Sequence, residues 1–108
     1  MRPRSQFERR INQRIPTPTG LLASCKINDR PIALHVQDFS VSGALLVTEE
    51  AIPVGTRMEL FFSAPEGEIH LLAVVRHSTQ GKGVGVEFVG MDAQAFDVVL
   101  KLMKRLLA

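Results

Sequence analysis

The chain has 108 residues, a net charge of +2 and a single cysteine, Cys25, and Leu, Ile, Val and Phe make up 35 of its residues. This length suits one domain and excludes two ordinary ones, and the apolar content excludes a disordered chain. One cysteine excludes both an internal disulfide and a cysteine-built zinc site, and it suits a reducing compartment.

Charge is unevenly distributed along the chain. Residues 1–14 contain five Arg and one Glu, a net charge of +4, whereas the remaining residues sum to −2. No apolar run approaches the roughly 18 residues that a membrane span requires, and no apolar segment follows the basic start as it would in a secretory signal. We therefore expect a cytoplasmic protein that does not span a membrane and whose basic partner surface is an N-terminal arm.

The first predicted element is a flexible basic arm over residues 1–18, which holds three prolines and few apolar residues to anchor it. Residues 19–108 are predicted to form one domain. Short apolar runs alternate there with turn signals, which is typical of an antiparallel sheet or barrel. The six predicted strands are Leu21–Ile27, Ile32–Gln37, Ala44–Thr48, Arg57–Phe62, Ile69–His77 and Val84–Val89.

Two local signals complete the predicted fold. Asn28 and Asp29 separate the first two strands, and because both residue types tolerate left-handed backbone we predict a hairpin turn there. From about residue 92 to 108, apolar side chains recur at helical spacing behind the capping residue Asp92, which predicts an amphipathic helix. The predicted apolar stripe consists of Phe96, Val99, Leu100, Met103, Leu106 and Leu107.

The predicted fold class is therefore all-β, a six-stranded antiparallel β-barrel with a C-terminal α-helix and a flexible N-terminal arm. In this interpretation the apolar stripe of the helix closes one end of the barrel. The alternative is a helix that is presented to a partner or to a membrane surface.

The arm carries the first pattern that indicates chemistry. Arg10 and Arg14 are four residues apart, and Arg9 directly precedes them. A guanidinium presents a planar fork that holds a phosphate through two charge-assisted bonds, binds O6 and N7 of guanine, or stacks on a purine. We interpret the two arginines as a phosphate-binding pair, and the alternative is a solvated tail that binds polyanions without specificity.

The second pattern is the hexapeptide DFSVSG, which begins at Asp38 directly after a predicted strand with alternating apolar residues. Asp38 and Ser40 continue the alternation of the apolar face. This local conflict is resolved only if the strand ends, opens or bulges there, and such conflicts concentrate at functional or strained positions. The alternative is a plain turn in which Gly43 takes a positive φ.

Together the two patterns resemble the signature of the PilZ domain family, RxxxR in an N-terminal arm followed by [D/N]xSxxG between two barrel strands. Arg10 and Arg14 match the first motif, and Asp38, Ser40 and Gly43 match the second without a substitution. The resemblance covers nearly the whole chain and includes a GVEF segment in the last predicted strand. It implies a PilZ-like split β-barrel and, as ligand, the bacterial second messenger cyclic di-GMP.

The roles that the resemblance implies agree with the chemistry of the side chains. Arg10 and Arg14 would bind the phosphates and the Hoogsteen edges of the guanines. Asp38 would accept from the guanine N1–H and N2–H₂ donors, and Ser40 would bond a phosphate or the arm. Gly43 would leave room where a side chain would collide with the ligand.

The resemblance also implies how the protein would act. Arg9 adds a third cation, and an Arg at this position is associated with a stacked pair of ligand molecules. We expect no other cofactor and no metal. The predicted protein is a receptor whose arm becomes ordered on binding and which then signals to an unidentified effector protein.

The same residues bear on three other classes of protein. A protein-interaction module of pilus or motility machinery, without nucleotide binding, remains an alternative. A nucleic-acid binder is disfavoured because the chain has no Trp or Tyr, and five of its six Phe occupy predicted strand, motif or helix positions. An enzyme is disfavoured because the three His show no ligand spacing and the SVSG sequence is no nucleophile elbow. Arg76 and His77 are further residues that could touch an outer base of the ligand.

Overall fold

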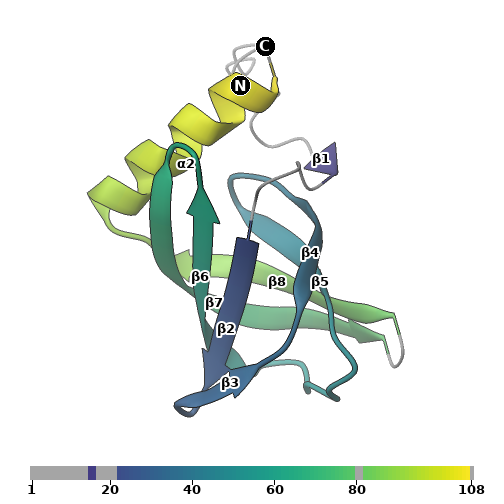
Figure 1. Cartoon of the computed structure of the whole chain (residues 1–108). Coiled ribbons are helices and arrows are strands. Elements are labelled where there is room, and N and C mark those ends of the chain that lie inside the picture. Colours follow the sequence, from purple (N-terminus) through teal and green to yellow (C-terminus); the bar gives the residue numbers. More distant parts are fainter. Residues whose placement is uncertain (1–14, 17–21, 80–81, 108) are drawn as a thin grey trace, which may run out of the picture.

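A computed structural model describes residues 15–16, 22–79 and 82–107 of the chain. Within these ranges one antiparallel sheet has the strand order β1-β4-β5-β8-β7-β6-β2-β3, and one helix packs against it. Figure 1 shows helix α2 crossing one end of the curled sheet, while the turn between β2 and β3 lies at the opposite end. The elements are β1 (Ile15–Pro16), β2 (Leu22–Ile27), β3 (Arg30–Ile32), β4 (His35–Phe39), β5 (Gly43–Val47), β6 (Arg57–Ala64), β7 (Gly67–Thr79), β8 (Gly83–Gly90) and α2 (Ala93–Leu106).

The predicted antiparallel, barrel-like sheet with a C-terminal helix is confirmed, but two details differ. The described sheet is not closed, since β1 and β3 are its two edges. It has eight strands instead of six. Ile15 and Pro16 add β1, and the segment predicted as one strand from Ile32 forms the separate strands β3 and β4. Residues 1–14 and 17–18 of the predicted arm lie outside the described residues, so its flexibility stays a prediction.

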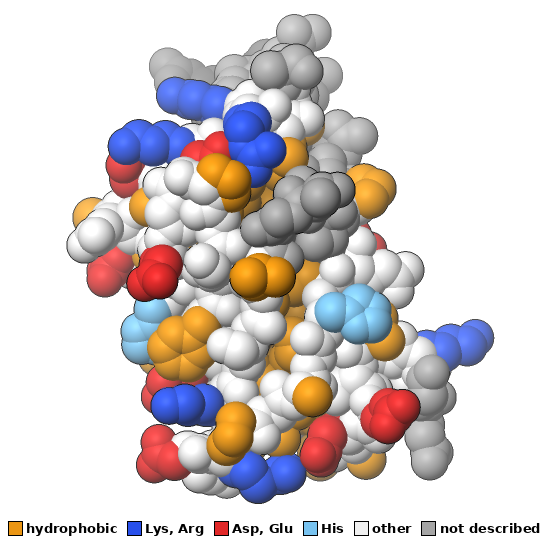
Figure 2. Space-filling model, viewed as in Figure 1, with side chains coloured by type: hydrophobic (Ala, Val, Ile, Leu, Met, Phe, Trp, Pro, Cys, Tyr) orange, Lys and Arg blue, Asp and Glu red, His pale blue; other side chains and the backbone are white. Residues whose placement is uncertain are grey.

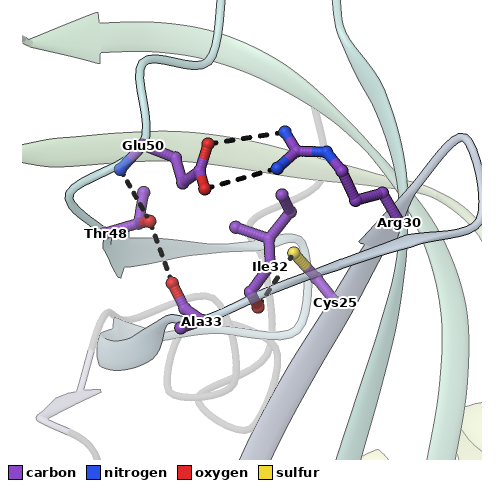
Figure 3. A network of polar contacts seen from close by, with 6 residues as sticks. All are labelled: Cys25, Arg30, Ile32, Ala33, Thr48 and Glu50. Atoms are coloured by element: carbon purple, nitrogen blue, oxygen red, sulfur yellow. Dashed lines mark hydrogen bonds and ion pairs between the residues drawn. The ribbon is translucent and has the colours of Figure 1, made fainter.

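The break between β3 and β4 has a local cause. The hydroxyl of Thr48 donates to the carbonyl oxygen of Ala33 at 2.9 Å and accepts from the backbone N–H of Glu50 at 3.1 Å. Both Glu50 carboxylate oxygens face the guanidinium of Arg30 at 3.4 Å. Figure 3 shows this network at the end of the β4–β5 hairpin where Ala33 and Thr48 meet. The carbonyl of Ala33 therefore bonds a side chain instead of continuing a strand ladder.

The predicted turn at Asn28–Asp29 is confirmed. Both residues have left-handed backbone, with φ of 53° and 63°, and they join β2 to β3. Cys25 of β2 lies opposite Ile32 of β3, and both side chains are buried in the core. Burial raises the pKa of the Cys25 thiol to about 11. This cysteine is therefore a packed core residue with little thiolate at neutral pH.

The helix begins at the predicted cap, because the side chain of Asp92 accepts from the backbone N–H of Ala95 at 2.7 Å. Its buried face is rotated relative to the predicted stripe. Phe96 was expected on that stripe but is 46% exposed. The helix face that contacts the sheet includes Ala95, the residue before Phe96, and continues at a spacing of three and four residues. The buried helix residues are Ala95, Val98, Val99, Leu102 and Met103.

The last turn of the helix is fixed to the β6–β7 turn. The guanidinium of Arg105 donates to both carboxylate oxygens of Glu66, and the pair lies between helix and hairpin. This interaction lowers the pKa of the Glu66 carboxyl and raises that of Arg105. Because two guanidinium nitrogens bond the two oxygens of one carboxylate, the interaction fixes the orientation of the helix end relative to the turn as well as its distance. Among the described residues, no helix has the length and apolar character to cross a membrane.

Candidate functional site

The DFSVSG segment runs from the end of β4 through the turn to the first residue of β5, and a β-bulge in β4 directly precedes it. The register between these strands shifts between Val36 and Asp38, so Gln37 is the extra residue. A bulge reverses the alternation of side chains beyond it. Phe39 therefore points into the core with 4% exposure, while Asp38 is only half-buried. The conflict that the sequence places at Asp38 is resolved by this bulge.

The turn after the bulge is held by Ser40. Its backbone N–H donates to the carbonyl oxygen of Gly43 at 2.8 Å. Its hydroxyl, in a side chain that is 3% exposed, accepts from the backbone N–H of Ser42 at 3.3 Å and lies 3.2 Å from the Ser42 hydroxyl. Ser40 thus stabilises the turn between β4 and β5 through its own hydrogen bonds. The predicted contact of its hydroxyl with a ligand would be a second role.

Gly43 is required by strand packing. A Cβ atom at this position would lie 2.3 Å from the carbonyl oxygen of Val86 on β8. Gly43 is not among the described glycines with positive φ, so the plain-turn alternative does not explain it. That a side chain at this position would collide with a ligand stays a prediction. A side chain would, however, collide with the backbone of β8.

Strand β1 brings the end of the predicted arm to the same turn. Ile15 pairs with Phe39 and Pro16 pairs with Asp38 in an antiparallel ladder. Ile15 directly follows Arg14 in the sequence. Arg9, Arg10 and Arg14 lie outside the described residues, so their contacts stay a prediction. Asp38, Ser40 and Gly43 are close together in one described turn.

A hollow of about 280 Å³ borders this turn. The guanidinium of Arg76 lies 3.4 Å from the carboxylate of Glu87, and both side chains are about half exposed. Sequence reasoning named Arg76 and His77 as residues that could reach a ligand, but it missed Glu87 because the pairing of β5 with β8 has no local signal. The hollow is lined by Ser42, Gly43, Arg76, His77, Gly85, Val86 and Glu87.

A larger cavity, of about 680 Å³, lies away from the motif beside β2, β6 and the start of α2. In it the rings of Phe61 and His70 stack with centroids 4.5 Å apart, and the ammonium of Lys26 lies 5.8 Å from the Phe61 ring. These side chains are exposed or half-buried, and their contacts with one another are ordinary packing of aromatic and long charged side chains on a protein surface. None of the described motif residues, Asp38, Ser40 and Gly43, lines this cavity, whereas Gly43 lines the smaller hollow, which is therefore the candidate site.

The part of the chain that follows the predicted arginine motif carries no net positive charge. The residues after position 14 sum to −2. On the face drawn in Figure 2, acidic and basic side chains of the described residues are interspersed. Within the described ranges no group of three or more His, Cys, Asp or Glu could hold a metal ion. Positive charge is concentrated instead in the sequence of residues 1–14.

Comparison with known proteins gives a consistent family and fold. The PilZ domain family model matches residues 3–107. The chain is similar to the PilZ domain of CeSA from a cellulose-synthesizing bacterium, with a TM-score of 0.66 and 19% identity over 89% of this chain and 99% of that one. It is also similar to an uncharacterized Legionella protein, with a TM-score of 0.58 and 14% identity over 88% and 94% of the two chains. No curated protein sequence matches it.

Proposed function

This chain belongs to the PilZ domain family, whose members are typically non-catalytic, cyclic di-GMP-binding adaptors, and from this premise we propose that it is itself a cyclic di-GMP receptor. The ligand would lie over the β4–β5 turn, between that turn and the arginines of the arm. The proposed binding residues are Arg9, Arg10, Arg14, Asp38, Ser40 and Gly43.

The observation that carries this proposal is the ladder between β1 and β4. Pro16 lies opposite Asp38, and Ile15 lies opposite Phe39. The residue before Ile15 lies outside the described residues, and because consecutive Cα atoms are about 3.8 Å apart we propose that its backbone also reaches this turn. That residue is Arg14, the second arginine of the RxxxR motif. The ladder between the residues that follow RxxxR and the strand that carries Asp38 supports the proposal that both motifs act on one ligand.

The two motifs offer complementary chemistry to the ligand. Cyclic di-GMP carries two phosphates and two guanines in a compact ring. Guanidinium groups form paired, charge-assisted bonds with phosphates and bind guanine O6 and N7. The half-buried carboxylate of Asp38 lies beside β1 and offers an acceptor for guanine N–H donors. Because the residues after position 14 sum to −2, the arginines of the arm would bind the phosphates.

Ligand binding would be coupled to ordering of the arm. Five arginines within residues 1–14 repel one another until the phosphates neutralise part of their charge. Binding would then fix the arm across the β4–β5 turn and create a new surface of arm, ligand and turn. An effector protein that recognises this surface would receive the signal.

A calorimetric titration of substituted proteins tests the proposal. Arg10→Ala, Arg14→Ala and Asp38→Ala should each weaken cyclic di-GMP binding by about 5-fold to 150-fold, because each removes contacts worth about 1–3 kcal/mol. Arg57→Ala removes an exposed arginine of β6 and controls for the loss of one positive charge. Titration curves that match the unsubstituted protein in all three variants would refute the proposed site.

A further inference from the structure

Two charged side chains beside the motif are not among the binding residues proposed above. Arg76 near the end of β7 and Glu87 on β8 line the same hollow as Ser42 and Gly43. We propose that Arg76 and Glu87 form a guanine-selective subsite, which recognises the base edge of a guanine nucleotide and rejects adenine. This inference rests on the proposed function and deepens it by naming residues that set base specificity.

Glu87 is positioned by its pairing with the motif. It is the direct partner of Gly43 in the ladder between β5 and β8. Directly paired residues point to the same face of a sheet. Because Gly43 has no side chain, the space beside the Glu87 side chain on that face is not filled from β5 at this position. The backbone N–H of Phe88 donates to the carbonyl oxygen of Ser42 at 2.9 Å, which holds β8 against the turn. The carboxylate of Glu87 therefore borders the turn directly.

Arg76 is directed outward by a second bulge. The register between β7 and β8 shifts between Val75 and His77, so Arg76 is the extra residue. Val75 is fully buried, whereas Arg76 and His77 are both exposed. Bulges re-aim side chains in this way and are frequent beside functional sites. The guanidinium of Arg76 consequently reaches from β7 to Glu87 on the adjacent strand β8.

His77 provides one wall of the subsite. It pairs with Gly85 of β8, and a Cβ atom at Gly85 would lie 3.2 Å from the imidazole Cδ2 atom. The ring therefore lies close over the backbone of β8, at a position where the strand has no side chain. The ring and the Arg76–Glu87 pair line the same hollow.

The geometry of the pair matches one base in particular. The nearest nitrogen of Arg76 and oxygen of Glu87 are 3.4 Å apart, and the side chains are 50% and 54% exposed. Such an exposed ion pair contributes little to stability, so both groups remain available to a ligand. In guanine the acceptor O6 neighbours the donor N1–H, and an adjacent guanidinium and carboxylate complement these two groups.

Adenine presents the opposite arrangement. Its amino group is a donor where guanine has O6, and its N1 is an acceptor where guanine has N1–H. A bound adenine would turn a donor toward Arg76 and an acceptor toward Glu87. Unmatched charged groups of this kind produce selectivity by penalising the wrong ligand.

The test compares cyclic di-GMP with cyclic di-AMP by calorimetry. The quantity compared is the dissociation constant of cyclic di-AMP divided by that of cyclic di-GMP. In Glu87→Gln and Arg76→Met this ratio should fall by about tenfold or more from its value in the unsubstituted protein. Glu59→Gln and Arg57→Met change exposed or half-buried charges on β6 and should leave the ratio unchanged. An unchanged ratio in both subsite variants overturns this inference even when cyclic di-GMP binding itself is intact.

Mononucleotides separate the subsite from the proposed function. If the unsubstituted protein binds neither cyclic dinucleotide, the proposed function fails, and amide spectra recorded with 5′-GMP and 5′-AMP then decide the inference alone. The subsite predicts shifts at Gly43, His77 and Gly85 with 5′-GMP that exceed those with 5′-AMP and vanish in Glu87→Gln. Equal responses to the two mononucleotides overturn it.

Discussion

Gly43 packs so closely against Val86 that a Cβ atom on the glycine would lie 2.3 Å from the valine carbonyl oxygen. Both residues are buried, and β5 and β8 are paired along this stretch. The last position of the DxSxxG motif is therefore fixed by the distance between two strands. A ligand-binding motif and a packing requirement coincide at one residue.

Gly43→Ala should destabilise the protein in the absence of any ligand. The added methyl group forces β5 and β8 apart, and overpacking of this kind costs about 1–3 kcal/mol. Denaturant unfolding measures the loss, with Ser63→Thr as a control that adds a methyl group at an exposed strand position. An unfolding midpoint equal to that of the unsubstituted protein would contradict the packing role and leave ligand clearance as the reason for the glycine.

Ser40→Ala should also lower stability before ligand is added. The substitution removes the bond that the Ser40 hydroxyl accepts from the Ser42 backbone N–H. A buried hydrogen bond of this kind contributes about 1 kcal/mol. Unfolding in denaturant without nucleotide is the measurement, and Ser63→Ala, at an exposed strand serine, is the matched control. Equal stability of Ser40→Ala and the unsubstituted protein would assign the hydroxyl to ligand contact alone.

Arg9→Ala is expected to change the number of ligand molecules bound. The arginine directly before the RxxxR motif is associated, through the family resemblance, with a stacked pair of ligands. We predict two molecules of cyclic di-GMP per chain for the unsubstituted protein and one for Arg9→Ala, read as calorimetric stoichiometry. Arg4→Ala removes another arm arginine and should keep the original stoichiometry. If all three proteins bind the same number of cyclic di-GMP molecules per chain, Arg9 does not control the stoichiometry.

The Glu66–Arg105 pair predicts a pH dependence of stability. The hydrogen bond from Arg105 lowers the pKa of the Glu66 carboxyl from its ordinary value of 4.5. A carboxyl whose pKa is lower in the folded state adds its full stabilisation above the unfolded pKa and loses it as the pH falls through the folded pKa. The stability difference between the unsubstituted protein and Glu66→Gln should be largest near neutral pH and shrink below about pH 4.5.

Urea unfolding at pH 7 and at pH 3 measures this difference. Glu68→Gln removes an exposed carboxylate from the same hairpin and controls for the change in net charge. A Glu66→Gln effect that is as large at pH 3 as at pH 7 would show that the ion pair is not its origin.

The sequence predicts those parts of the fold that depend on neighbouring residues. The turn at Asn28 and Asp29 follows from their tolerance of left-handed backbone, and the start of the helix follows from the capping side chain of Asp92. The irregularity at Asp38 also follows, because a carboxylate in register with an apolar face requires a bulge or an end.

Features that depend on distant pairing were not predicted from the sequence. Nothing local to Gly43 or Glu87 indicates that the two residues lie opposite one another, since strand order arises from the packing of the whole sheet. The exposure of Phe96 was missed for a related reason. Helical spacing gives the width of an apolar stripe, but the sheet decides which side of that stripe is covered.

The central claim is that this protein binds cyclic di-GMP between its N-terminal arm and the β4–β5 turn. The most direct measurement is a titration of the unsubstituted chain with cyclic di-GMP, followed by calorimetry and by the amide resonances of residues 2–15 and 38–43. The account predicts saturable binding with a dissociation constant of about 1 μM or tighter, equivalent to about −8 kcal/mol, and shifts in both segments during the same transition. The absence of binding heat, or shifts confined to residues far from both segments, would contradict it.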